Sequence, residues 1–256
     1  LLETFIMYSM NDAGNQKPKD LSYVSRPAIE DHPQNHDHEI KGALITAIRD
    51  VTIDICKSGQ NQLNRVLVLV EKFEWNAFKR IGLHLLRVIE DAPLHLIEER
   101  LLRKDYFDSA EVHHEYYHLM KQNFGHLSPA GQDQILIWID QAEDEKKWVD
   151  NDSELTTRQR ERLLKRWTYK KLYPIQEYLA GEWKERFSRL KEEIGELDIP
   201  PDFQSWIGGG WIGSTSPRAA EELSEMSMDG LVDYLKKWRP SGDWMAPTPE
   251  GLGSAL

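Results

Sequence analysis

The chain has 256 residues, of which 40% are hydrophobic and 29% charged, and its formal net charge is −11. This balance is typical of a folded chain and argues against wholesale disorder, while the excess of negative charge disfavours non-specific attraction to nucleic acid or to an anionic membrane. The single cysteine, Cys56, excludes an internal disulfide framework and fits a reducing, cytoplasmic compartment.

No apolar run approaches the roughly 20 residues that cross a bilayer, so we expect no membrane span. The chain starts at Leu1 without a methionine, inside an apolar segment, and it ends on a pattern that resembles a helix start with no helix after it. We therefore expect a piece of a longer polypeptide.

Residues 1–38 are expected to form an N-terminal segment and a long loop, because Asn11–Asp37 is rich in proline, asparagine, aspartate and histidine. The loop at 31–38 carries His32, His36 and His38. These side chains could hold a metal ion, although a solvated loop is the commoner outcome for such a composition.

Helical periodicity begins at Glu39 and continues to about residue 199. The first helix ends at Ser58-Gly59, and its predicted buried stripe comprises Leu44, Ile45, Ile48, Val51, Ile55 and Cys56. The second helix buries Leu63, Val66, Leu67, Leu69 and Val70, a third covers Trp75–Ile89, and Pro93 starts a fourth. The first helices of successive pairs begin near Lys41, Trp75 and Ser109, which is a period of roughly 35 residues. The sequence thus predicts an all-α fold of stacked antiparallel helix pairs, either a HEAT-like α-solenoid or an irregular helical array.

The third pair is predicted over Phe107–Gln141. Asp108 and Glu111 resemble a capping box, Gly125 suits a left-handed helix end, and Ser128 with Pro129 starts the next helix.

The same pair contains a literal H-E-x-x-H, with His114, Glu115 and His118. In a zinc peptidase such histidines bind the metal and the glutamate activates its water. His126, Glu143 and Glu145 are available as third ligands, but none has a diagnostic spacing. With Tyr116 at the centre of the buried face, both histidines fall roughly 160° away. We therefore expect a solvated face with no metal and no catalytic residue; the alternative is zinc on His114 and His118, with Glu115 as general base.

Gln141–Ser153 is polar and is predicted to be a loop, followed by helices over Leu155–Lys171, Pro174–Leu179 and Glu182–Ile194. The first of these carries a basic ridge, which we define as Arg158, Arg162, Lys165 and Arg166. The ridge could contact phosphates or an acidic partner, or it could be an ordinary solvated face.

Residues 200–256 are expected to form a Trp/Gly-rich connection and C-terminal helices of the same array. In WIGGGWIGST, Ser214 stands where a phosphate-binding loop requires lysine. We therefore expect a connection anchored by Trp206 and Trp211, then a helix opened by Ser216-Pro217 and a helix over Met228–Trp238 capped by Ser227.

At RIGLHLL, ERLL, YFDSAEVHHEYYHLM and LSPAGQDQILIWI, and again at WIGSTSPRAAEELSEMSMDGLVDYLKKW, the chain resembles helical-repeat regions of very large bacterial proteins. Those proteins resemble signal-transducing NTPases with α-solenoid sensors, a class tied to conflict with phage. The resemblance implies that the solenoid recognises a partner while NTPase and effector modules lie elsewhere, since no intact nucleotide-binding motif is present here.

Together these patterns predict a non-catalytic scaffold or recognition segment that binds a protein partner or other domains of its own polypeptide. The contact candidates are the basic ridge, Trp206 and Trp211. The alternatives are a zinc-dependent hydrolase and, more weakly, a nucleic-acid-binding scaffold that uses the ridge.

Overall fold

The computed structural model describes residues 20, 22–35, 40–59, 62–151, 155–197, 199–203, 216–218, 220–224, 226–239 and 252. The described residues are helical and contain no strand, which confirms the predicted all-α class. The chain divides into two compact units, 1–206 and 207–256, with the division just after the Pro200–Phe203 turn. Trp206 and Trp211, the predicted anchors of the connection, lie outside the described residues.

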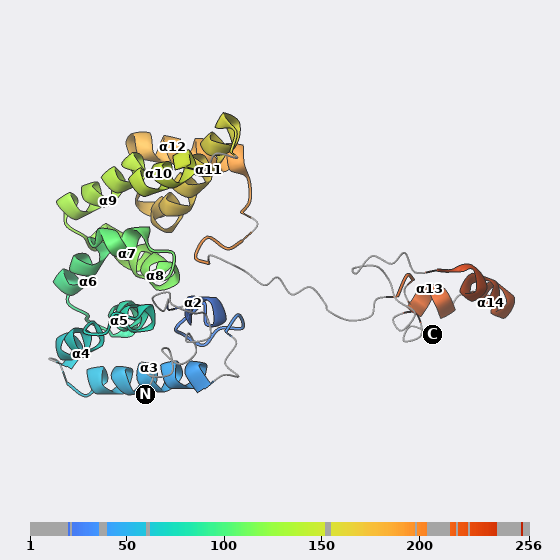
Figure 1. Ribbon diagram of the computed structural model, residues 1–256, viewed down its shortest axis with the longest axis horizontal. Helices are drawn as coiled ribbons and strands as arrows, with labels where there is room; N and C mark the ends of the chain where they lie inside the picture. Colours follow the sequence, from blue (N-terminus) through green and yellow to red (C-terminus); the bar gives the residue numbers. More distant parts are fainter. Residues whose placement is uncertain are drawn as a thin grey trace. The chain divides into compact units, whose positions relative to one another are not determined.

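The helices of the first unit follow one another in chain order from α3 to α12 (Figure 1). Its first part comprises the short α2 (Ser22–Ser25), then α3 (Ile40–Lys57), α4 (Gln62–Val70), α5 (Asn76–Val88) and α6 (Leu94–Leu101). Helices α3 and α4 pack against each other and both contact α5, while α2 also lies on α5. The helix pairs expected in this part therefore form.

The middle of the unit differs from the predicted hairpin. Helix α7 covers Lys104–Asp108, and α8 starts only at His113 and ends at Asn123. The proposed Asp108 capping box is wrong, since Asp108 ends a helix instead of starting one. The N-cap of α8 is Val112, which has no side-chain cap, and the Ser109 hydroxyl accepts a hydrogen bond from the Val112 amide in the turn before the helix.

Gly125 is not a left-handed helix end. It lies in the 3-10 turn η2 (Phe124–His126), and positive φ among the described glycines occurs only at Gly181 and Gly195. A Cβ at Gly125 would lie 2.3 Å from Cε1 of Tyr178. The position therefore needs glycine for space, not for its backbone freedom.

The last part of the unit comprises α9 (Pro129–Gln141), α10 (Glu143–Asn151), α11 (Thr157–Leu172), the 3-10 helix η3 (Tyr173–Tyr178) and α12 (Gly181–Ile194). Residues 143–151 were predicted to be a loop and are helical, with Val149 fully buried. The predicted helix starts at 128–129 and 155–156 are confirmed: Ser128 caps α9, and Thr156 with Gln159 forms a capping box on α11.

One continuous hydrophobic core runs through the first unit, from Ile29 and Ile45 at one end to Phe187 and Leu190 at the other. The predicted stripe of α3 is partly wrong. Val51 and Ile55 are 57% and 41% exposed, whereas Arg49 and Thr52 on the same helix are buried. The reason is that α3 turns Arg49 towards the polar segment 26–31, described below, which the periodicity could not reveal, while the Thr52 hydroxyl bonds to the Ile48 and Arg49 carbonyls of its own helix.

The second unit has α13 (Ala220–Ser224) and α14 (Met228–Lys237), and Ser227 caps α14 as predicted. Among the described residues, no helix is long and apolar enough to cross a membrane.

Candidate functional site

Helix α8 lies at the centre of the first unit and contacts α5, α6, α7, η2 and η3. The prediction that both histidines face water is wrong for His114, which is 6% exposed, whereas the side chain of His118 is partly exposed, at 25%. The helical wheel placed them correctly opposite Tyr116, which is also buried. It could not show that segments distant in sequence cover the opposite face as well.

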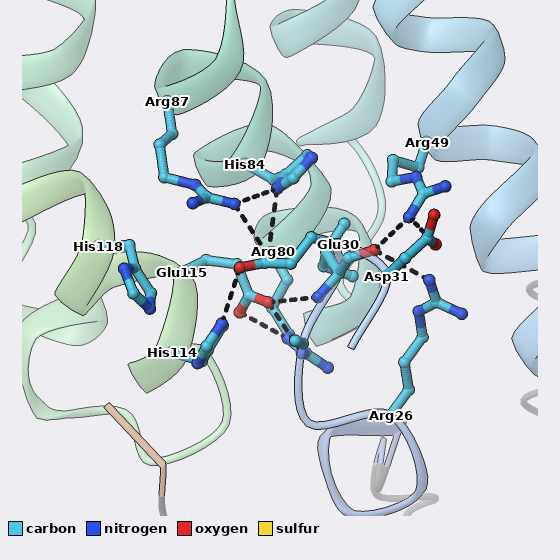
Figure 2. Close-up of polar contacts among 12 residues, drawn as sticks. Arg26, Glu30, Asp31, Arg49, Arg80, His84, Arg87, His114, Glu115 and His118 are labelled. Atoms are coloured by element: carbon cyan, nitrogen blue, oxygen red, sulfur yellow. Dashed lines mark hydrogen bonds and ion pairs between the residues drawn. The ribbon is translucent and has the colours of Figure 1, made fainter. Parts of the chain in front are cut away.

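The glutamate of the motif forms a buried ion pair with α5 (Figure 2). Arg80 donates from Nε to Oε2 of Glu115 at 2.7 Å and from Nη2 to Oε1 at 2.9 Å, and both side chains are at most 1% exposed. The Ile29 amide also donates to Oε1, at 2.9 Å. Burial raises the pKa of Glu115, but the charge and hydrogen bonds of Arg80 outweigh this and hold the pKa below its usual range.

The Ile29 carbonyl is held by two arginines. Arg26 Nη2 donates to this oxygen at 2.9 Å, and Arg49 Nη1 donates to it at 3.0 Å. Arg49 also pairs with Asp31 at 2.7 Å. Arg26, Arg49 and Asp31 thus fix the segment 26–31 to α3, which explains why Arg49 is buried.

Glu30 projects from this segment between α5 and α8 (Figure 2). Its Oε1 lies 3.1 Å from Nε2 of His114, and its Oε2 lies 2.9 Å from Nη2 of Arg87 and 3.5 Å from Nδ1 of His84. Burial acts to raise the pKa of Glu30, but the hydrogen bonds from both histidines and the Arg87 charge lower it overall, so the carboxylate stays ionised.

The turn at 200–203 covers the other side of the histidines. His113 Nε2 bonds to the Pro201 carbonyl at 2.8 Å, His114 Nδ1 lies 3.3 Å from the Asp202 carbonyl, and His118 Nε2 lies 3.0 Å from Asp202 Oδ2. Burial lowers the pKa of His113 to about 3, so this ring is neutral and Nε2 carries its proton to reach the carbonyl. The ring of Phe203 packs against His114, with centroids 4.4 Å apart.

Three potential metal ligands therefore converge. Ligand atoms of Glu30, His114 and His118 lie within 4.8 Å of one another, and the carboxylate of Asp202 borders both histidines. The third member is a glutamate from the N-terminal loop, not His126, Glu143 or Glu145. Glu115 is not part of this group, since both of its oxygens are engaged by Arg80 and by the Ile29 amide.

The remaining predicted contact residues lie elsewhere. In the basic ridge on α11, Arg158, Arg162 and Lys165 are exposed and Arg166 is half-buried. Lys165 pairs with Glu193 of α12. The ridge borders a cavity of about 280 Å³, whose lining includes Arg166, Trp167, Lys170 and Lys171.

The loop histidines divide between described and undescribed positions. His36 and His38 lie outside the described residues, while the ring of His32 packs in a tilted orientation against that of Phe203, with ring centroids 4.9 Å apart.

Sequence reasoning missed Glu30, Asp202, Arg80 and Arg87. Each is an ordinary charged residue in a loop or on a helix, and nothing in its local pattern indicates burial. The sequence of α8 gives a weak indication of these buried partners. The helix HHEYYHLMKQN is so polar that it can lie at the centre of the unit only if other polar side chains pair with it.

No protein-family model matches the chain, and comparisons with curated proteins and with solved structures find no match either. Fold and site together define an all-α helical array whose central helix carries a buried cluster of histidines, carboxylates and arginines.

Proposed function

We propose that the chain is a non-catalytic, HEAT-like helical-repeat segment of a larger cytoplasmic bacterial protein, and that it binds a protein partner or holds other modules of the same polypeptide. The packing of consecutive helices along one continuous core supports this proposal, because repeat arrays bury each helix pair against the next. The net charge of −11 disfavours nucleic acid as the partner.

The observation that carries the proposal is the apolar surface of the first helix pair. On α3 and α4, Ile40, Val51, Ile55, Val68 and Leu69 are all between 41% and 61% exposed. The end of a helical array needs a polar outer face unless another repeat or a partner covers it. Exposed aliphatic residues gathered on the terminal pair therefore favour a covering protein surface.

The test is site-specific photo-crosslinking of the full chain in bacterial cells. A photoreactive phenylalanine analogue placed at Val51 or Leu69 should yield one reproducible crosslinked protein, identified by mass spectrometry. The same analogue at Arg162 tests the basic ridge, and the exposed Glu177 on η3 is the matched control. The discrete product should disappear when Val51→Lys is combined with the analogue at Leu69. Products no different from those of the Glu177 control would contradict the proposal.

The zinc-hydrolase alternative is favoured by one observation, the convergence of His114 and His118 with a carboxylate. The contacts of Glu115 weigh against it, because a general base needs a carboxylate oxygen that reaches the metal-bound water. Zinc-dependent cleavage of peptide or ester substrates that is lost in Glu115→Gln would establish the hydrolase and contradict the scaffold.

A further inference from the structure

We propose that Glu30, His114 and His118 bind a divalent transition-metal ion of the zinc class, and that Asp202 orients the imidazoles, so that the ion fastens the N-terminal segment and the 200–203 turn to α8. This inference does not depend on the scaffold function, since a structural metal is compatible with either functional assignment.

The hydrogen-bonding of His114 is the first argument. Its Nδ1 lies 3.3 Å from the Asp202 carbonyl, which only accepts, so Nδ1 carries a proton. Its Nε2 lies 3.1 Å from the Glu30 carboxylate, which is ionised beside Arg87 and also only accepts. If the ring were neutral, the lone pair of His114 Nε2 would face a lone pair of Glu30 Oε1. A positive charge must therefore lie between Nε2 and Oε1, either as a second ring proton or as a metal ion.

The surrounding charges also favour a cation. Glu115 and Arg80 neutralise each other, which leaves Glu30 and Asp202 against Arg87 in the immediate surroundings of the histidines. Two carboxylates and one guanidinium leave one negative charge without a fixed positive partner. Burying an unbalanced negative charge is costly, so these surroundings favour a cation at the histidines; one proton on His114 would balance the charge, and a divalent ion would leave one positive charge.

The ligand set selects the kind of metal. Histidine nitrogens with a carboxylate oxygen suit zinc and its neighbours, which bind at about 2.0–2.2 Å, whereas calcium and magnesium prefer oxygen ligands alone. Ligand atoms around such a tetrahedral ion are about 3.4 Å apart, as bonds of that length imply. The 3.1 Å separation of His114 Nε2 and Glu30 Oε1 is close to this, whereas the three ligand atoms together span up to 4.8 Å, so the side chains would have to close on the ion.

Asp202 completes the arrangement as a supporting residue. Its Oδ2 lies 3.0 Å from His118 Nε2 and 3.6 Å from His114 Nδ1. Carboxylates that hold the outer N–H of a metal-bound histidine fix the ring and raise its basicity. A cavity of about 20 Å³, which is room for one water molecule, opens beside His114 and Asp202 on the side lined by Ala110 and Glu111.

The test uses the full chain, stripped with a chelator and titrated with zinc in competition with a chromogenic chelator. We expect one zinc per chain, a rise in melting temperature on zinc addition, and visible absorption bands typical of tetrahedral coordination when cobalt(II) replaces zinc. His118→Ala should weaken zinc binding more than 100-fold, and Asp202→Asn about 10-fold, as is usual for a residue that supports a ligand. His118 is partly exposed, so its alanine variant should fold, which circular dichroism verifies.

His126→Ala is the matched control, because this histidine is exposed on η2. It should bind zinc as the unmodified chain does. The inference is overturned if the chain binds no zinc, if His118→Ala binds as tightly as His126→Ala, or if the zinc is lost only in His36→Ala/His38→Ala. Zinc-dependent hydrolysis, by contrast, would contradict the scaffold and leave the metal site standing.

Discussion

The buried Arg80–Glu115 pair should dominate the stability of the first unit, and Arg80→Leu tests this. The substitution leaves a carboxylate that is 1% exposed with the Ile29 amide as its remaining donor. Removing one partner of a buried ion pair costs about 3–5 kcal/mol. That is a large part of the roughly 5–15 kcal/mol that stabilises a folded protein.

A double-mutant cycle separates the interaction energy of the Arg80–Glu115 pair from the cost of removing buried side-chain volume. Glu115→Leu should also cost about 3–5 kcal/mol. The double variant has no stranded charge and leaves the Ile29 amide without its acceptor, for which about 1–3 kcal/mol is expected. The cycle should thus show a coupling of several kcal/mol, far above that of separate sites.

Urea denaturation followed by circular dichroism provides the free energies, with Lys165→Met as the control. Lys165 and its partner Glu193 are about half exposed, so breaking this surface pair should cost at most about 1 kcal/mol. The reasoning would be refuted if Arg80→Leu were as mild as Lys165→Met, or if the two leucine substitutions were simply additive.

Three further perturbations follow from other contacts. Gly125→Ala should destabilise the chain by about 1 kcal/mol, the lower end of the cost of overpacking, because Tyr178 is 43% exposed and can shift. Gly82→Ala is the control, since its new methyl group meets only ordinary contacts at 3.6–3.7 Å and should not destabilise the chain. Thermal melts compare the two variants, and equal effects would contradict the steric explanation. Burial lowers the pKa of Lys171 from 10.5 to about 8. Between these pH values the unfolded chain binds more protons than the folded chain, so the contribution of Lys171 to the free energy of unfolding rises with pH. The free energy of unfolding of Lys171→Met relative to the unmodified chain should therefore fall from pH 8 to pH 10, and a pH-independent difference would contradict the shift. Asp20 accepts from backbone amides at the starts of α2 and α5, so Asp20→Ala should cost about 1–2 kcal/mol in urea denaturation. No cost would contradict the capping role, and an Asp20→Asn variant as stable as the unmodified chain would show that the charge contributes nothing.

Helix positions were largely predictable because they depend on local signals. The caps at Ser128 and Ser227 lie next to the helices they define. Helix α10 was not predicted, because its sequence is polar although Val149 is fully buried.

The site was not predictable, because its partners are distant in sequence. The wheel showed which residues share a face of α8, but the residues that cover His114 come from positions 30 and 202. Local periodicity cannot locate such contacts. It therefore assigned the polar face to water, the usual partner of histidines on a helix surface.

The hydrogen bond between the Ile29 amide and Glu115 also determines when the N-terminal part of the chain can complete its folding during synthesis. The two residues are 86 positions apart, so the Ile29 segment leaves the ribosome well before its acceptor exists. At elongation rates of about 5–20 residues per second the delay is about 4–17 seconds. Until Glu115 emerges, the Ile29 amide and, once it is made, Arg80 lack their buried carboxylate partner, so this part of the chain cannot complete its polar contacts before α8 is synthesised.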